Sequence, residues 1–153
     1  MTGQGLRIIR PLVMVAAAAI SSCLPLESTA NAPTTFLKSM EPGWASFEVR
    51  DGIGPDRAWA TVFQLLARSF DIEVAQKEDG YIRTAWSYTW TGTYTRSYRV
   101  RITAMFAENA KRLDVRTEAQ YSQGAEAWVV GTDTSLLSTT KTDLMGTIGR
   151  TTR

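Results

Sequence analysis

The sequence contains no histidine and a single cysteine, Cys23, and these shortages exclude several kinds of chemistry. Nucleophilic systems of the Ser-His-Asp or Cys-His type need an imidazole, and zinc sites built from His and Cys need several such ligands. The phosphate loop G-x-x-x-x-G-K-[ST], the dinucleotide fingerprint G-x-G-x-x-G and the nucleophile elbow G-x-S-x-G are also missing. We therefore assign no catalytic residue and no metal ligand from the sequence.

Carboxylates are the acid–base groups that remain. Two carboxylates at a suitable separation hydrolyse a glycosidic bond in many enzymes. The spacing of the acids in this chain singles out no pair, and acids on strand surfaces and turns are usually solvated. The candidates are Asp71, Glu73, Glu78, Asp79, Asp114, Glu118 and Asp133. The sequence therefore favours a protein that is not an enzyme.

The chain has little excess charge of either sign, with 17 Lys+Arg against 15 Asp+Glu. Arg7 and Arg10 account for the difference, because they lie in an N-terminal segment without acidic residues, and residues 23–153 are balanced. A clustered basic face is the electrostatic signature of nucleic-acid binding. We therefore expect no nucleic-acid partner.

The apolar run near the N-terminus is short. It covers residues 11–20, follows Arg7 and Arg10, and is followed by the small residues Ser21 and Ser22. A basic region, an apolar region of roughly 7–15 residues and a small-residue cleavage site describe a secretory signal. A permanent membrane-spanning helix needs about 20 residues, and a surface helix needs a polar face. We expect residues 1–22 to be a signal peptide.

The segment Ile20-Ser21-Ser22-Cys23 resembles the bacterial lipoprotein signal. The resemblance implies cleavage between Ser22 and Cys23, a diacylglycerol on the Cys23 sulfur and an N-acyl chain, such as palmitate, on its new amino group. The chain would then be held on the periplasmic side of the cell envelope. Leu24, in place of an aspartate, favours the outer over the inner membrane. The alternative is a soluble secreted protein with an unpaired cysteine.

The remaining sequence predicts a tether and one domain. Residues 24–43 contain three prolines and several Ser and Thr residues without sustained periodicity, which is typical of a flexible linker. We therefore expect the lipidated cysteine and tether at residues 23–43, and a single α+β domain at 44–153.

Within that domain, alternating apolar and polar residues predict strands near 44–50, 71–77, 81–90, 98–106 and 113–121. A helix is expected from Pro55 to about Phe70, and a last helix after a cap at Thr132 or Asp133. In that last helix Leu137, Lys141, Leu144 and Ile148 are expected to share a face, with Met145 at its edge. Residues 122–131 are expected to form a loop. The predicted fold is an antiparallel sheet of about four to five strands with two helices packed on one face.

A second resemblance concerns residues 44–121. The pattern of Ala58-Trp59, Leu66, Phe70-Asp-Ile-Glu, Lys77-Glu-Asp-Gly80-Tyr-Ile82-Arg-Thr and Trp86 is similar to a helix-grip-like domain found in a lipoprotein component of the outer-membrane β-barrel assembly machinery. That family has a long N-terminal segment and two such domains, whereas this chain has a short tether and one. No functional residue other than Cys23 is carried over.

Aromatic residues supply the candidate binding surface. Trp90 and Tyr94 lie near the turn at Gly92, and Trp128 lies between two glycines, so these three are candidate partner-binding residues. We expect Ile82, Trp86 and Tyr98 to be core residues instead. The outward face of the sheet should carry Arg83, Arg99, Arg101, Arg116 and Glu118. We interpret it as a solvated face with weak ion pairs, and an anion- or partner-binding face is the alternative.

The sequence favours a lipid-anchored, non-enzymatic envelope protein that acts by contact with the membrane and with another envelope component. The alternative is a carrier of a small apolar ligand or lipid in a cavity between helix and sheet. A carboxylate-dependent hydrolase is a third hypothesis. No cofactor is expected besides the lipid on Cys23.

Overall fold

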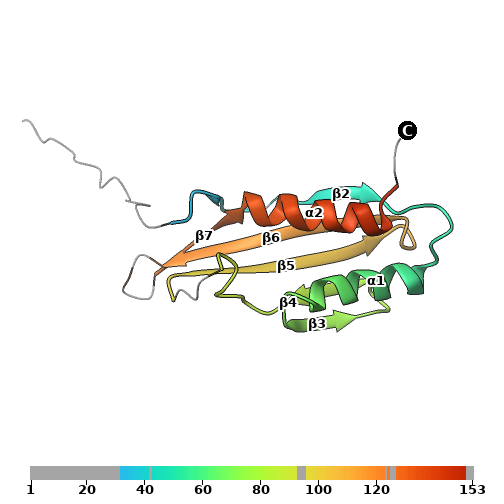
Figure 1. Cartoon of the computed structure of the whole chain (residues 1–153), viewed down its shortest axis with the longest axis horizontal. Coiled ribbons are helices and arrows are strands. Elements are labelled where there is room, and N and C mark those ends of the chain that lie inside the picture. Colours follow the sequence, from blue (N-terminus) through green and yellow to red (C-terminus); the bar gives the residue numbers. More distant parts are fainter. Residues whose placement is uncertain (1–31, 42, 93–95, 123, 125–126, 151–153) are drawn as a thin grey trace, which may run out of the picture.

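The computed structural model describes residues 32–150, except residues 42, 93–95, 123 and 125–126. Two helices cover one face of an antiparallel sheet (Figure 1). In chain order the elements are β1 (Phe36–Lys38), β2 (Ala45–Glu48), α1 (Pro55–Ala67), β3 (Ile72–Gln76), β4 (Tyr81–Thr84), β5 (Tyr98–Ala107), β6 (Arg112–Ser122), β7 (Trp128–Asp133) and α2 (Thr134–Ile148). The sheet order is β1-β7-β6-β5-β4-β3, and β2 pairs with the other half of β6.

The sheet has seven strands, so the prediction of four to five strands is wrong, although the α+β class agrees with the structure. The prediction lacks strands β1 and β7. β1 has three residues, too few to show an alternating pattern, and β7 lies partly in the glycine-containing stretch 122–131 that we expected to be a loop. Both strands are held by pairing with their neighbours in the sheet, which a local pattern does not reveal.

Strand β1 falls within residues 23–43, the range expected for the tether. It pairs with β7 and packs over Gly131, where an added Cβ would lie 2.3 Å from the carbonyl oxygen of Leu37 and 2.7 Å from the ring of Phe36. The Phe36 ring also makes an edge contact with Tyr98, with centroids 6.1 Å apart. The glycine that made β7 look like a loop is therefore the residue that allows β1 to approach.

The two helices begin as the sequence predicts. Pro55 occupies the first turn of α1, and the Asp133 carboxylate caps α2 by accepting a hydrogen bond from the Leu136 amide at 2.9 Å. α1 ends at Ala67 instead of near Phe70. The buried stripe of α2 also differs from the predicted face, because Leu136 and Thr140 are buried in place of Leu137 and Lys141. It consists of Leu136, Thr140, Leu144 and Ile148.

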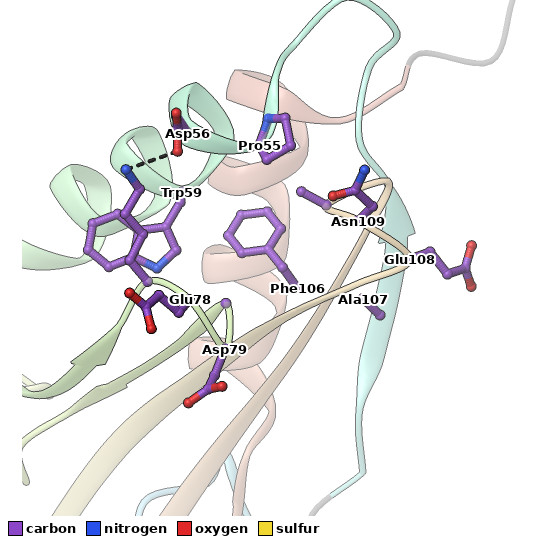
Figure 2. Close-up of a pocket in the computed structure, with 12 residues that line it drawn as sticks. Pro55, Asp56, Trp59, Glu78, Asp79, Phe106, Ala107, Glu108 and Asn109 are labelled. Carbon is purple, nitrogen blue, oxygen red and sulfur yellow. Dashed lines mark ion pairs between the residues drawn. The ribbon is translucent and has the colours of Figure 1, made fainter.

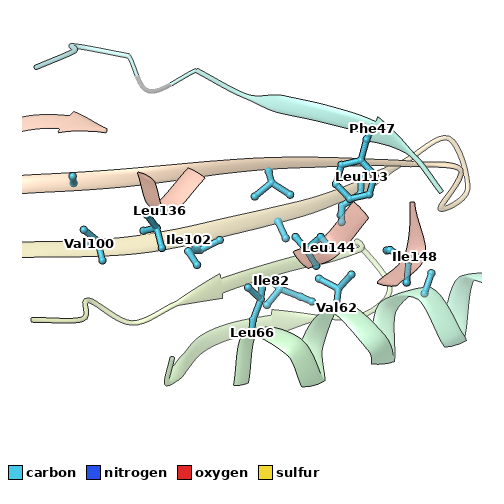
Figure 3. Close-up of a cluster of buried hydrophobic side chains, with 14 of the residues drawn as sticks. Phe47, Val62, Leu66, Ile82, Val100, Ile102, Leu113, Leu136, Leu144 and Ile148 are labelled. Carbon is cyan, nitrogen blue, oxygen red and sulfur yellow. The ribbon is translucent and has the colours of Figure 1, made fainter. Parts of the chain in front are cut away.

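The core lies between the helices and the inner face of the sheet, as Figure 3 shows. Val62 and Leu66 of α1, Leu144 of α2 and Ile102 of β5 all belong to this core cluster. Ile82 and Tyr98 are buried, as predicted. Trp86 is only half-buried and lies outside this core, because β4 ends at Thr84 and the alternation does not continue to residue 86.

No helix in the described part of the chain has the length and apolar character needed to cross a membrane.

Candidate functional site

The outer face of the sheet, opposite the helices, is lined by arginines. The register of β5 and β6 places Arg99 beside Gln120 and Arg101 beside Glu118, and Arg116 is the partner of Thr103. Because side chains alternate along a strand, all of these point away from the core. Three tryptophans from other segments reach the same arginines. We call this set of residues the Arg–Trp face: Arg99, Arg101, Arg116, Trp44, Trp86 and Trp128.

Arg99 makes more aromatic contacts than the other two arginines of the Arg–Trp face. Its guanidinium carbon lies 4.6 Å from the ring centroid of Trp86 and 4.1 Å from that of Trp128. Its Nε and Nη2 donate to the side-chain oxygen of Gln120 at 2.9 and 2.6 Å, and its Nη1 donates to the Tyr88 hydroxyl at 2.9 Å. A guanidinium is attracted to the negative face of an indole ring, so two tryptophans stabilise the charge that Gln120 and Tyr88 hold in place. No carboxylate among the described residues pairs with Arg99.

Arg101 and Arg116 share one acid. Arg101 forms an ion pair with Glu118 and lies 4.4 Å from the centroid of Trp86. The other carboxylate oxygen of Glu118 lies 3.5 Å from Arg116 Nη2, and Arg116 lies 4.9 Å from the ring of Trp44. Glu118 therefore pairs with two of the three arginines of the Arg–Trp face. Each of these charged side chains is partly shielded from water, which strengthens their interactions.

Two of the three predicted binding aromatics lie in the described part of the chain. Trp128 belongs to the Arg–Trp face, although it begins β7 and does not lie in a loop. Trp90 is half-buried and packs against the core, where its ring stacks on that of Phe70 with centroids 6.2 Å apart. Tyr94 lies outside the described residues, as do Ser22 and Cys23. Sequence reasoning missed the role of Trp86, because its position in phase with Ile82 suggested the core.

Asp133 is a fully buried carboxylate at the junction of β1, β7 and α2. Besides the Leu136 amide, it accepts hydrogen bonds from the Tyr98 hydroxyl at 2.6 Å and from the Thr35 hydroxyl at 3.0 Å. Burial, and then the hydrogen bond and the negative charge of Asp133, raise the pKa of the Tyr98 hydroxyl far above its ordinary value. The site joins the N-terminal strand to the last helix, so Asp133 serves the fold.

Three of the other six candidate acids are engaged in ion pairs. Asp114 pairs with Arg112 at 3.1 Å and Glu73 with Arg83 at 3.0 Å, while Glu118 belongs to the arginine network. In the described part of the chain, no group of three or more His, Cys, Asp or Glu side chains is placed to hold a metal ion.

Glu78 and Asp79 line a cleft of about 460 Å³ at one end of the molecule, beside Trp59 (Figure 2). Asp56 on the rim forms an ion pair with Lys77 at 2.9 Å. In Figure 2 the Asp79 side chain is directed away from the Trp59 ring. The cleft is open and mixed in polarity, and its acids do not converge on one point.

The opposite wall of this cleft is the β5–β6 turn. Its residues Glu108, Asn109 and Ala110 have φ of 54°, 56° and 62°, in the left-handed region. For residues with a side chain this conformation costs roughly 1–2 kcal/mol each, so neighbouring contacts must hold the turn. One such contact is the close approach of Gly80 to Phe106, whose amide donates to the Gly80 carbonyl at 2.9 Å.

A cavity between α1, α2 and the sheet has a volume of about 130 Å³. Its walls are mostly apolar and include Leu66, Ile102 and Leu136. Small-molecule pockets usually measure about 300–1,000 Å³, so this cavity is too small for a lipid chain or a drug-sized ligand. This cavity therefore gives no support to the carrier hypothesis, which stays a prediction.

No protein-family model matches the chain, and no curated protein matches its sequence. The chemistry of the Arg–Trp face and of the N-terminal segment is therefore the basis for a functional proposal.

Proposed function

We propose that this protein is a lipid-anchored, non-enzymatic binding module of the bacterial cell envelope that contacts another envelope component through the Arg–Trp face. The observation that carries the proposal is the placement of Arg99 over the rings of both Trp86 and Trp128, on the face of the sheet that the helices leave uncovered. The anchor is inferred from Ile20-Ser21-Ser22-Cys23, and Leu24 favours the outer membrane.

Side-chain chemistry supports contact with a partner. Tryptophan, tyrosine and arginine dominate the binding energy of protein interfaces, especially where they are already packed and partly shielded from water. Trp86, Tyr88 and Arg99 have these properties, since each is half-buried and Arg99 contacts both aromatic rings. A face built in this way loses little side-chain freedom when a partner binds.

The likeness of residues 44–121 to a domain of an envelope lipoprotein agrees with this location. We carry over no functional residue from it, and we propose no role in barrel assembly.

The anchor is tested by the intact mass of the protein expressed in a bacterium, beside the Cys23→Ser variant. We expect a mass that begins at Cys23 and includes acyl groups, and the loss of these groups in the variant. An unmodified Cys23 thiol in the purified protein would contradict the lipid anchor, and a retained N-terminus would contradict the signal peptide.

The contact surface is tested by placing a photo-activated cross-linking residue at Val130 or at Met145 in the full chain, in the bacterium that produces it. Both side chains are 38% exposed. Val130 is the β7 partner of Gln120 on the outer face, whereas Met145 lies on α2. We expect a specific adduct from Val130 and none from Met145. Absence of an adduct at Val130, or the same adducts from both positions, would refute the proposed surface.

A further inference from the structure

We infer that the Arg–Trp face recognises a carboxylate in an acidic segment of a partner protein, with Arg99 as the residue that binds it. This inference rests on the binding function proposed above and names the chemistry of the partner.

The first argument is the number of hydrogen-bond donors on Arg99. A guanidinium has five N–H groups in a planar fork. Three are used in the described contacts, two by Gln120 and one by Tyr88. Two N–H groups remain, and the half-buried side chain still reaches solvent. A carboxylate with its two coplanar oxygens is the group that a guanidinium fork fits best.

The second argument is that the described partners fix Arg99 without neutralising it. Gln120 and Tyr88 are uncharged, and the guanidinium carbon lies over the indole rings of Trp86 and Trp128. Arg101 differs, because its charge is balanced by Glu118. Arg83 also points outward and is balanced by Glu73. Arg99 is thus the one arginine of the Arg–Trp face that pairs with no carboxylate among the described residues, whereas Arg101 and Arg116 share Glu118.

The third argument concerns the class of partner. The fixed charges of the outer face alternate in sign, since Glu118 lies between Arg101 and Arg116, and Asp114 lies beside Arg112. A uniformly negative surface, such as a lipid bilayer or a nucleic acid, would bring its phosphates against Glu118 and Asp114. Cations that bind membranes usually extend from the surface on flexible stems. Here the Arg101 and Arg116 side chains are only 21% and 29% exposed. A polypeptide carries charges in a pattern that can match such a surface, so we favour an acidic protein segment.

The inference is tested with the full-length lipidated protein in neutral detergent. The probe is a peptide whose glutamates are separated by neutral residues, so that it is not uniformly negative, and the same peptide with glutamine in place of glutamate is the matched control. Intrinsic tryptophan fluorescence reports binding directly, because Trp86 and Trp128 flank the site. We expect a saturable change with the glutamate peptide and none with the glutamine peptide at the same concentrations.

Two variants test the role of Arg99. Arg99→Lys keeps the charge and removes the fork, and we expect the peptide to bind it about 10- to 100-fold more weakly, the usual effect of losing a charged hydrogen bond. Arg83→Gln removes a positive charge from the same face at a position already paired with Glu73, and we expect a change below about threefold. Thermal unfolding of each variant shows whether the fold is retained.

Equal binding of the two peptides would overturn the inference. So would equal weakening by Arg99→Lys and Arg83→Gln, because it would indicate general electrostatic attraction. Stronger binding to vesicles of anionic phospholipid than to the peptide would also overturn it, because it would show that the face binds a lipid phosphate and not a protein carboxylate. These outcomes differ from a failure of the proposed function, which is the absence of a cross-linked partner at Val130.

Discussion

The two sides of the sheet each hold a partly or fully buried ionic group, and they satisfy it in different ways. On the inner side, Asp133 is fully buried and has three hydrogen-bond donors from its own chain. On the outer side, Arg99 is half-buried and retains two donors after its contacts with Gln120 and Tyr88. A charge satisfied within the chain stabilises the fold, whereas a charge held in place but unbalanced is available to a partner.

The two sides also differ in what stabilises them. The inner side is stabilised by apolar burial, at about 25 cal/mol per Å² removed from water. The outer side depends on contacts between arginine and tryptophan, each worth roughly 0.5–2 kcal/mol. Substitutions on the inner side should therefore change stability most, and substitutions on the outer side should mainly change binding.

The largest effect is expected in the core. Leu144→Ala removes a fully buried side chain between α2 and the sheet, and should lower the free energy of unfolding by about 2–5 kcal/mol. The matched change on the outer face is Met105→Ala, where the side chain is 36% exposed, and the loss should stay within about 1 kcal/mol. Urea denaturation measures both values, and equal losses would remove the distinction between the two sides.

The next largest effect is expected at Asp133. Asp133→Ala removes the cap of α2 and leaves the Tyr98 and Thr35 hydroxyls without their acceptor, which should cost about 2–4 kcal/mol. Asp133→Asn keeps a capping oxygen and should cost less than the alanine variant. Chemical denaturation distinguishes the two variants. An Asp133→Ala variant with the free energy of unfolding of the parent protein would show that this carboxylate does not join β1, β7 and α2.

A third prediction tests the position of β1. Gly131→Ala forces a methyl group against the Leu37 carbonyl and should cost about 1–3 kcal/mol. It should also weaken protection of the Thr134 amide from hydrogen exchange, because that amide donates to the Thr35 carbonyl at 3.0 Å. Gly146→Ala is the control, since its site in α2 is open, and it should stabilise the protein by up to about 1 kcal/mol. The same direction of change in both variants would contradict the packing of β1 on β7.

A fourth prediction follows from the raised pKa of Tyr98. In the unfolded chain this hydroxyl ionises near pH 10, and in the folded protein it stays protonated to higher pH. The stability that it contributes is therefore complete below about pH 10 and is lost as the pH rises further. Tyr98→Phe should cost about 1–2 kcal/mol at neutral pH and lose less stability between pH 9 and 11 than the parent protein. Parallel stability curves for the two proteins would contradict the coupling to Asp133.

The smallest effect on stability is expected at the Arg–Trp face. Arg99→Lys should change the free energy of unfolding by less than about 1 kcal/mol, because the charge remains near Trp86 and Trp128. The tryptophan emission should nevertheless shift, since the guanidinium plane no longer contacts either ring. A loss as large as that of Leu144→Ala would show that the outer face serves the fold rather than a partner.

Much of the fold is predictable from local patterns. The alternation in residues 98–106 and 113–121 predicts two strands with one apolar and one charged face, and they form β5 and β6. Asp133 is recognisable as a possible helix cap, and it caps α2. These features depend on neighbours within a few residues, which is the range over which side-chain periodicity and capping act.

The candidate site is only partly predictable. The alternation places Arg99, Arg101 and Arg116 on the outward face, and Trp128 is a candidate binding anchor. No local pattern places Trp86 on the same side, because it lies in phase with the buried Ile82. Trp86 does not follow Ile82 onto the inner face, because β4 ends at Thr84. The end of a strand depends on the length of the neighbouring strands as much as on its own residues.

The sequence by itself determined the α+β class, the start of each helix, the outward position of the arginines and the exclusion of histidine-based and multi-cysteine chemistry. The tertiary structure decided the seven-strand sheet, the packing of β1 on Gly131 and the enclosure of Arg99. The physical reason is the range of the interactions. Periodicity and capping act between near neighbours, whereas the two rings on Arg99 come from segments that meet only when β4, β5, β6 and β7 pair in register.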